Sequence, residues 1–438
     1  MSIFSRRFAA LALCAAGAMA LVASLLAPTV QGTTQPIKTI VLGVLYDQEP
    51  DTQASTRAAA AEAAGRELNE YFQLSSTPIR VQLELRETGK NPTRAVAAVQ
   101  ELYGQGVRLF VGPSTSEEVR AIEALPISAN IVMVSPSSTA PSLGKRNANL
   151  FRLAPDDGYQ SEAITSLMWS DGVRIVVPVW RQDIYGVELT DEVRRDFTAL
   201  GGQVMAGTGY SPDTQDFSAV ARTIGQQVRD AVALAGRDAV AVYAVTFDEI
   251  TGLMVAADEV PGLNLVWWYG SDGVATERVI FDNPVVSNFA WQTAFTAPIY
   301  GEDVYVQEAL DVAEIIRQQT RMAPEPYAFT TYDAVMLAGL AAARAGSSTS
   351  AQQLAGAVTE TASTYFGVTG PMTLNERGDR TVGEYEYWTV QSRADELYWV
   401  RVGTFAFDPT GPGTVERSRP HYHPGLSIDI SDLPTPRR

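Results

Sequence analysis

The sequence predicts an α/β protein made of two successive units, each with a parallel sheet that helices cover on both faces. Two observations support this prediction. The chain has 438 residues, which is too long for one ordinary hydrophobic core and favours two lobes. Short apolar runs typical of buried strands also alternate along the chain with longer runs typical of helices, and this alternation indicates parallel strands joined by helices.

In the first unit, strand and helix patterns follow one another closely. A proline at the start and a glycine at the end of residues 92–106 are typical signals of helix boundaries. The expected elements are strand Thr39–Tyr46, helix Thr56–Gln73, strand Ile79–Leu85, helix Pro92–Gly106, strand Val107–Val111, helix Ser116–Leu125 and strand Ile131–Val134.

The same pattern then starts again, so we expect a second unit of the same architecture. The expected elements are strand Val173–Val179, helix Val187–Leu200, strand Gly202–Gly207, helix Phe217–Ala235, strand Ala239–Val245, helix Glu249–Val260, strand Leu265–Trp268, helices Asp303–Gln319, Tyr332–Ala345 and Ser350–Thr361, and strands Glu384–Val390 and Leu397–Val402. From Asp408 onward, proline, glycine and charged residues dominate, which predicts an irregular tail.

Composition excludes several classes of function. The formal net charge is −17, and a surface that binds nucleic acid needs a basic face, so nucleic acid is not an expected partner. The chain has one cysteine, Cys14, and two histidines, His421 and His423, all near its ends. The folded body therefore lacks a disulfide, a thiolate nucleophile, the commonest general base and the commonest nitrogen ligand of metals. We expect no metal site and no cofactor.

The N-terminus predicts export. Arg6 and Arg7 precede an uncharged run, Phe8–Ala27, that is just long enough to span a bilayer. The basic start, the apolar middle and Ala18-Met19-Ala20 also fit a secretory signal peptide. A cleaved signal peptide, an uncleaved anchor and a lipoprotein on Cys14 all remain open, and each of them places the folded body outside the cytoplasm.

Two hydroxyl-rich loops follow strands of the first unit, and open α/β sheets bind ligands at the carboxyl ends of their strands. The first loop brings Ser116 to the start of a helix, whose free N–H groups attract a carboxylate. The alternative is a capping box alone. The second loop carries Ser137, Ser138 and Thr139 between prolines that stiffen it. These hydroxyl groups either donate to a ligand carboxylate or only satisfy the turn.

Carboxylates and aromatic rings lie at other predicted strand ends. Asp157 and Asp272 are costly to desolvate unless they are paired, so a ligand ammonium group would suit either of them. The alternative is a turn or a helix cap, especially for Asp272 beside Gly273. Small-ligand pockets usually combine aromatic walls with a few polar groups, although an aromatic residue is more often part of a core. The aromatic candidates are Tyr46, Tyr185, Phe247 and Phe329.

In their order and spacing, these motifs resemble the type I periplasmic binding proteins of ABC importers, specifically the leucine/isoleucine/valine-binding branch. The resemblance runs from about Ile37 to Phe405. The motifs that carry it are Gly112-Pro113 with its serines, Ser135-Pro136-Ser137-Ser138-Thr139-Ala140-Pro141, Phe151-Arg152 with Asp157 and Gln160, Asp183-Ile184-Tyr185-Gly186, Thr331-Tyr332-Asp333-Ala334, Gly367-Val368-Thr369-Gly370-Pro371 and Gly378-Asp379-Arg380.

The resemblance implies two Rossmann-like lobes with parallel central sheets, joined by a three-strand hinge and closing on a ligand. This arrangement is the type I periplasmic binding protein fold. The implied division is residues 1–36 for the signal peptide or anchor with its linker, 37–157 and 299–364 for lobe 1, 158–298 and 365–405 for lobe 2, and 406–438 for an irregular tail.

The resemblance also implies roles for residues of lobe 1 and its border. The positions that match those holding the amino-acid carboxylate are Ser116, Ser137, Ser138 and Thr139. Asp157 matches a position that contacts the ammonium group. These five residues are therefore expected to bind the constant part of an amino acid.

On the opposite lobe, Asp272 matches an ammonium-binding glutamate whose side chain is one methylene longer. Tyr185 matches an aromatic wall, and Phe247 falls where the family often has tyrosine, so one hydroxyl contact is lost. Phe329 matches a further aromatic residue of the pocket.

The expected function is capture without catalysis. A monomeric protein outside the cytoplasm would bind a small amino acid, or a related carboxylate or amide, and present it to an ABC permease. One alternative is a membrane-tethered sensor with the same domain. A more distant alternative is a hydrolase of small amides, which the lack of histidine, of cysteine and of a Gly-x-Ser-x-Gly elbow in the body argues against.

Overall fold

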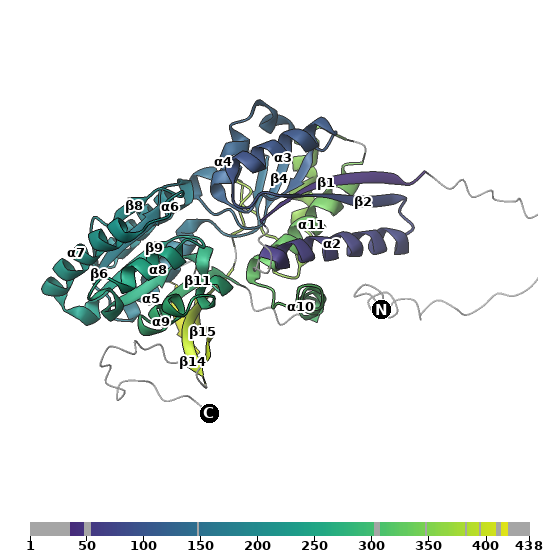
Figure 1. Cartoon of the computed structure of the whole chain (residues 1–438). Coiled ribbons are helices and arrows are strands. Elements are labelled where there is room, and N and C mark those ends of the chain that lie inside the picture. Colours follow the sequence, from purple (N-terminus) through teal and green to yellow (C-terminus); the bar gives the residue numbers. More distant parts are fainter. Residues whose placement is uncertain are drawn as a thin grey trace, which may run out of the picture.

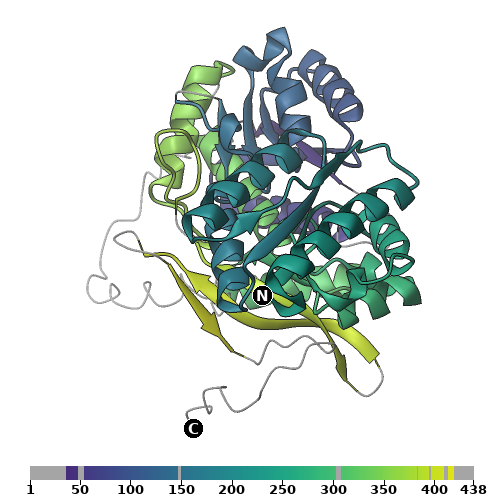
Figure 2. The same cartoon turned by 90° about the vertical axis from the view of Figure 1, so that its left-hand side faces the viewer.

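The computed structural model describes residues 36–47, 54–146, 149–301, 307–346, 348–381, 383–393, 396–408 and 413–418. These residues form two lobes, each a sheet covered by helices (Figures 1 and 2). The predicted signal or anchor segment, Cys14 and both histidines lie outside the described residues, as does most of the predicted tail.

Lobe 1 contains a five-stranded parallel sheet in the order β2-β1-β3-β4-β5. Its strands are β1 (Lys38–Tyr46), β2 (Ile79–Glu87), β3 (Leu109–Val111), β4 (Val132–Ser135) and β5 (Leu150–Arg152). One face carries α3 (Pro92–Gly104) and α4 (Ser116–Glu123), and the other carries α2 (Ala54–Leu74), α10 (Gln307–Thr320), α11 (Pro326–Arg344) and α12 (Ala351–Ala362) (Figure 1). Because each face has its own apolar cluster, the strands are buried on both sides, as their apolar runs predict.

Lobe 2 contains a larger, mixed sheet in the order β16-β15-β14-β11-β10-β9-β6-β7, with β8 paired to β6. Its strands are β6 (Ile175–Arg181), β7 (Gln203–Val204), β8 (Thr208–Tyr210), β9 (Val240–Val245), β10 (Trp267–Gly270), β11 (Thr296–Tyr300), β14 (Tyr385–Arg393), β15 (Glu396–Ala406) and β16 (Thr414–Arg417). Its helices are α5 (Asp157–Ser170), α6 (Ile184–Ala199), α7 (Ser218–Ala235), α8 (Ile250–Asp258) and α9 (Pro284–Gln292). The strands from β6 to β11 pair in parallel, and the last three pair antiparallel. The predicted α/β class with parallel sheets is confirmed.

Connections between the lobes lie side by side at the border of lobe 1. The chain first passes from lobe 1 to lobe 2 after β5. It passes from lobe 1 to lobe 2 a second time after the small hairpin of β12 (Phe366–Gly367) and β13 (Gly370–Pro371). Arg152 Nε donates to Asp379 Oδ1 at 2.6 Å, and both side chains are buried. A buried ion pair of this kind is costly to break, since the remaining charge would have no partner. It therefore holds the two connections together.

Two sequence-based expectations need correction. Thr414–Arg417 lies in the segment expected to be irregular, yet it forms β16 against β15. A neighbouring edge strand with free backbone groups determines this pairing, and the local composition does not reveal it. Helix α11 also begins six residues before the expected Tyr332, at Pro326. Its buried residues lie on every side, so the helix lacks the amphipathic period that would mark its start.

Candidate functional site

A small cavity lies between the lobes, at the carboxyl ends of their strands. Side chains of both lobes line it, including Ser116 and Thr139 from lobe 1 and Tyr185 and Asp272 from lobe 2. The cavity volume is about 40 Å³, which leaves room for about three water molecules. The lobes therefore stand close together, and they must separate to admit an organic ligand.

The first hydroxyl-rich loop is held by its own contacts. Thr115 caps α4 by accepting from the Glu118 backbone N–H at 3.3 Å, and the Glu118 carboxylate accepts from the Thr115 N–H at 3.1 Å. Ser116 Oγ accepts from the backbone N–H groups of Thr139 and Ala140, both at 3.1 Å. Because a hydroxyl group accepts two hydrogen bonds and donates one, the Ser116 O–H remains able to donate into the cavity.

The second hydroxyl-rich loop divides between the cavity and the protein interior. Ser137 and Thr139 line the cavity, and Ser137 Oγ also donates to the Ser114 carbonyl at 3.0 Å. Ser138 does not line it. Its side chain is fully buried, and its Oγ has no hydrogen-bond partner among the residues that the structure describes. Ser138 is therefore separated from the hydroxyl groups beside it in the sequence.

Asp272 is the carboxylate at the centre of the cavity wall. Its Oδ1 accepts from Tyr185 Oη at 2.5 Å and from Gln160 Nε2 at 2.9 Å, and its Oδ2 accepts from Tyr327 Oη at 2.5 Å. The Asp272 N–H in turn donates to Gln160 Oε1 at 2.9 Å. Groups from α5, α6 and α11 thus fix the orientation of a carboxylate that faces the lobe 1 hydroxyl groups.

Asp157 lies behind this carboxylate and does not line the cavity. It is fully buried, and Gln160 Nε2 donates to its Oδ1 at 2.9 Å as well as to Asp272. Burial, and next the negative charge of Asp272, raises the pKa of Asp157 well above its usual range. The Thr139 hydroxyl group, which lines the cavity, opposes this rise in pKa. Asp157 therefore acts on the cavity through its neighbours Gln160, Asp272 and Thr139.

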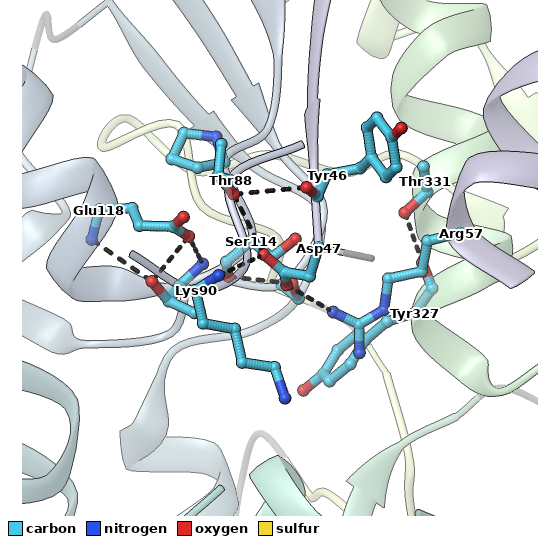
Figure 3. Close-up of polar contacts among 12 residues, drawn as sticks. Tyr46, Asp47, Arg57, Thr88, Lys90, Ser114, Glu118, Tyr327 and Thr331 are labelled. Carbon is cyan, nitrogen blue, oxygen red and sulfur yellow. Dashed lines mark hydrogen bonds and ion pairs between the residues drawn. The ribbon is translucent and has the colours of Figure 1, made fainter. Parts of the chain in front are cut away.

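An aromatic wall closes one side of the cavity. The rings of Tyr185 and Phe247 stack in parallel, with centroids 5.2 Å apart and planes 1° apart. The Arg181 guanidinium carbon lies 4.2 Å and the Lys90 ammonium 5.2 Å from the centre of the Phe247 ring. The Tyr46 ring points away from Asp47 and Lys90 (Figure 3), and Tyr46 does not line the cavity.

The expectation that Phe329 lines the pocket is wrong. Phe329 packs in the apolar core of lobe 1 and is 7% exposed. Successive residues of a helix turn by 100°, so positions two apart point to nearly opposite sides. Since Tyr327 in the first turn of α11 faces the cavity, Phe329 must face the core.

Sequence reasoning missed a charged end of the cavity. Its lining side chains are Asp47, Arg57, Lys90 and Glu277. Figure 3 shows Arg57, Lys90 and Tyr327 extending from lobe 1 below Asp47. Asp47 follows β1 directly, so the same strand-end rule that identified the hydroxyl loops could have identified it.

Pairing in this charged end crosses between elements that are distant in the sequence. Arg57 Nε donates to Glu325 Oε1 at 2.7 Å, and Arg57 Nη1 lies 3.5 Å from Asp47 Oδ2. Lys90 Nζ donates to Asp248 Oδ2 in lobe 2 at 3.0 Å. Within the described ranges, no group of three histidine, cysteine or acidic side chains is arranged to hold a metal ion. No helix in the same ranges is both long and apolar enough to cross a membrane.

Comparison with known proteins gives relatives over most of the chain. The family model described as "Receptor family ligand binding region" matches residues 56–393. The uncharacterized protein MJ1266 of Methanocaldococcus jannaschii is 28% identical over 388 residues, which cover 84% of this chain and 89% of that protein. The Leu/Ile/Val-binding protein homolog 1 of Brucella melitensis biotype 1 is 23% identical over 342 residues, which cover 77% and 86% of the two chains.

Solved structures share the fold. The leucine binding protein LivK of Thermotoga maritima superposes with a TM-score of 0.67 at 19% identity, over 82% of this chain and 97% of that one. A solute binding protein of R. palustris in complex with 4-hydroxybenzoate gives a TM-score of 0.68 at 16% identity, over 89% and 99%. The type I periplasmic binding protein fold and the resemblance to the leucine/isoleucine/valine-binding branch are thereby confirmed. The chain belongs to the receptor ligand-binding-region family.

Proposed function

We propose that this protein is a solute-binding protein of an ABC importer, located outside the cytoplasm, that captures a small amino acid between its two lobes. The observation that carries the proposal is the arrangement of Ser116 and Thr139 across the cavity from Asp272. Hydroxyl donors on one lobe suit a carboxylate, and a buried carboxylate on the other suits an ammonium group. An α-amino acid carries both groups on one carbon atom.

The mechanism follows from which lobe holds each group. A ligand that contacts both lobes at once stabilises the closed arrangement relative to the open one, and so shifts the equilibrium between them. The size of that shift depends on how much more tightly the closed form binds. A permease that recognises the closed form would then receive only loaded protein. No step of this mechanism requires covalent chemistry, so we also propose that the protein is not an enzyme.

A thermal-shift screen tests the proposal. The full chain should show a higher Tm with at least one α-amino acid, since a ligand that binds only the folded state stabilises it by mass action. The Asp272→Ala variant should lose the shift, and the same amino acid without its ammonium group, as the 2-hydroxy acid, should give none. If no amino acid or related amide shifts Tm, the ligand class is wrong.

A ligand sensor is a second candidate, favoured by the receptor description of the matching family. The capture site would be the same, but the closed form would report to a membrane partner instead of a permease. Mass spectrometry of the mature N-terminus distinguishes the two, because a cleaved, unlipidated form would leave residues 8–27 unable to tether the domain and argue against a sensor.

A further inference from the structure

We propose that the ligand ends in a short neutral group that both donates and accepts hydrogen bonds, of the carboxamide or ureido class, held between Glu277 and the cations Arg57 and Lys90. The inference rests on the proposed function and adds the identity of the ligand side chain. It concerns the charged end of the cavity, which the amino-acid contacts described above leave unused.

Both cations at this end already have carboxylate partners. Arg57 pairs with Glu325 at 2.7 Å and with Asp47 at 3.5 Å, and Lys90 pairs with Asp248 at 3.0 Å. Their positive charges are therefore balanced within the protein. They still line the cavity, and an ammonium group has three N–H donors and a guanidinium five, so they can donate further hydrogen bonds to a neutral acceptor.

Glu277 differs from the other carboxylates of this end. It lines the cavity from lobe 2, yet its side chain makes no hydrogen bond or ion pair with any residue that the structure describes. Burial raises the pKa of Glu277 to about 7. The positive charges of Lys90 and Arg57 lower this pKa, and the negative charges of Asp248 and Glu325 raise it. The Glu277 side chain is partly buried, and a ligand that covered it without donating a hydrogen bond would leave the carboxyl group without water or a partner. An N–H donor on the ligand would satisfy it.

Three other kinds of side chain fit this end poorly. An aliphatic tail would remove water from Arg57, Lys90 and Glu277 without replacing its hydrogen bonds. An anionic tail would lie beside Glu277 and Asp47, and it would have to displace existing carboxylate partners to pair with a cation. A cationic tail would meet Arg57 and Lys90.

A carboxamide or ureido group avoids each of these conflicts. Its carbonyl oxygen can accept from Lys90 or Arg57, while its N–H can donate to Glu277. It adds no net charge to the charged end, where the charges of Asp47, Arg57, Lys90 and Glu277 sum to zero when all are ionised. The small volume of the cavity also favours a short group.

The test compares ligands that share the α-amino acid part and differ in the tail. Isothermal titration with the full chain should show asparagine, glutamine or citrulline binding at least about tenfold more tightly than leucine, glutamate or lysine, as expected when one or two hydrogen bonds to charged groups are gained. Alanine serves as the ligand with no tail.

Glu277→Gln should weaken binding of the preferred amide about tenfold and leave alanine binding within twofold. Glu259→Gln, which changes an exposed carboxylate at the end of α8, is the matched control and should change neither. A preference for leucine, glutamate or lysine, or an unchanged amide affinity in Glu277→Gln, would overturn this inference and leave the proposed function intact. A failure of every amino acid to bind would overturn the proposed function itself.

Discussion

The two ends of the cavity are built differently. At the hydroxyl end, neutral hydroxyl and N–H groups around Ser116 and Thr139 face the carboxylate of Asp272, and the hydrogen bonds that hold these groups join residues 23 to 112 positions apart. At the charged end, Arg57 and Lys90 pair with Glu325 and Asp248, which lie 268 and 158 residues away in the sequence. The difference suggests a division of labour, in which the first end binds what all amino acids share and the second end selects among them.

The largest effect should come from removing the carboxylate shared by both lobes. Asp272→Ala should weaken amino-acid binding by about 2–5 kcal/mol, because a buried ammonium group would lose its charged partner. Titration calorimetry with the amino acid that gives the largest thermal shift measures the loss. Asp272→Asn, which keeps the side-chain shape and one acceptor oxygen for Tyr185 or Tyr327, checks that the folded structure survives. Near-wild-type affinity in both variants would remove Asp272 from the site.

A smaller loss is expected from Asp157, because it acts on the cavity through Gln160. Asp157→Ala should weaken binding by about 1–2 kcal/mol, the size of one or two hydrogen bonds. Asp157→Asn should cost less than Asp157→Ala, since burial raises the pKa of Asp157 and so favours the uncharged form that asparagine resembles. If Asp157→Asn instead reduced affinity as strongly as Asp272→Ala, Asp157 would carry the charge that we assign to Asp272.

This comparison also explains what the sequence could predict. The hydroxyl end follows a local rule, that ligands gather at the carboxyl ends of parallel strands, so Ser116, Thr139 and Asp272 could be named from strand patterns and family motifs. Arg57 and Glu277 lie within a helix and after a short turn, and only the closure of the lobes brings them to one cavity. No local sequence pattern predicts that these two side chains line the same cavity.

The fold shows the same contrast between local and distant determinants. Buried parallel strands such as β1 and β9 read as apolar runs. By contrast, β11 contains Pro298, and a proline argues against a central strand. Its place between β10 and β14 is set by pairing with residues about 90 positions later. The error at Phe329 has the same origin, because the first turn of α11 depends on the cap that Glu325 makes.

The correction at α11 yields a matched pair of variants. Tyr327→Phe should weaken amino-acid binding by about 1–2 kcal/mol, because it removes one hydrogen bond to a charged group. Phe329→Leu should leave affinity within twofold and lower the free energy of unfolding by about 1–2 kcal/mol, since it shrinks a core side chain. Calorimetric titration and urea unfolding separate the two effects. The reverse pattern would show that α11 turns its other face to the cavity.

The smallest effect should appear in the pH dependence of stability, through Glu118, which bonds Thr115 in the loop of the hydroxyl end, and Glu277 of the charged end. Burial, and next the charge of Asp47, raises the pKa of Glu118 to about 7, and burial likewise raises the pKa of Glu277 to about 7, from ordinary values of 4.5. The folded state therefore holds these protons more tightly than the unfolded state does. The contribution of these two groups to the unfolding free energy should be highest below pH 4.5 and fall as pH rises through 7, by about 1 kcal/mol per group once partial solvent access and nearby cations reduce the effect.

Urea unfolding of the ligand-free protein at pH 5 and pH 7.5 measures this fall in stability. Glu118→Gln and Glu277→Gln should each flatten part of it, because neither replacement side chain can ionise. A ligand amide that donates to Glu277 favours its ionised form. Ligand binding near pH 7 should therefore release protons in the wild type and not in Glu277→Gln. Calorimetric titrations in two buffers of different ionisation enthalpy detect this proton release. Proton release that persists in Glu277→Gln and disappears in Glu118→Gln would place the titrating group at the hydroxyl end, and the proposed difference between the two ends would then be lost.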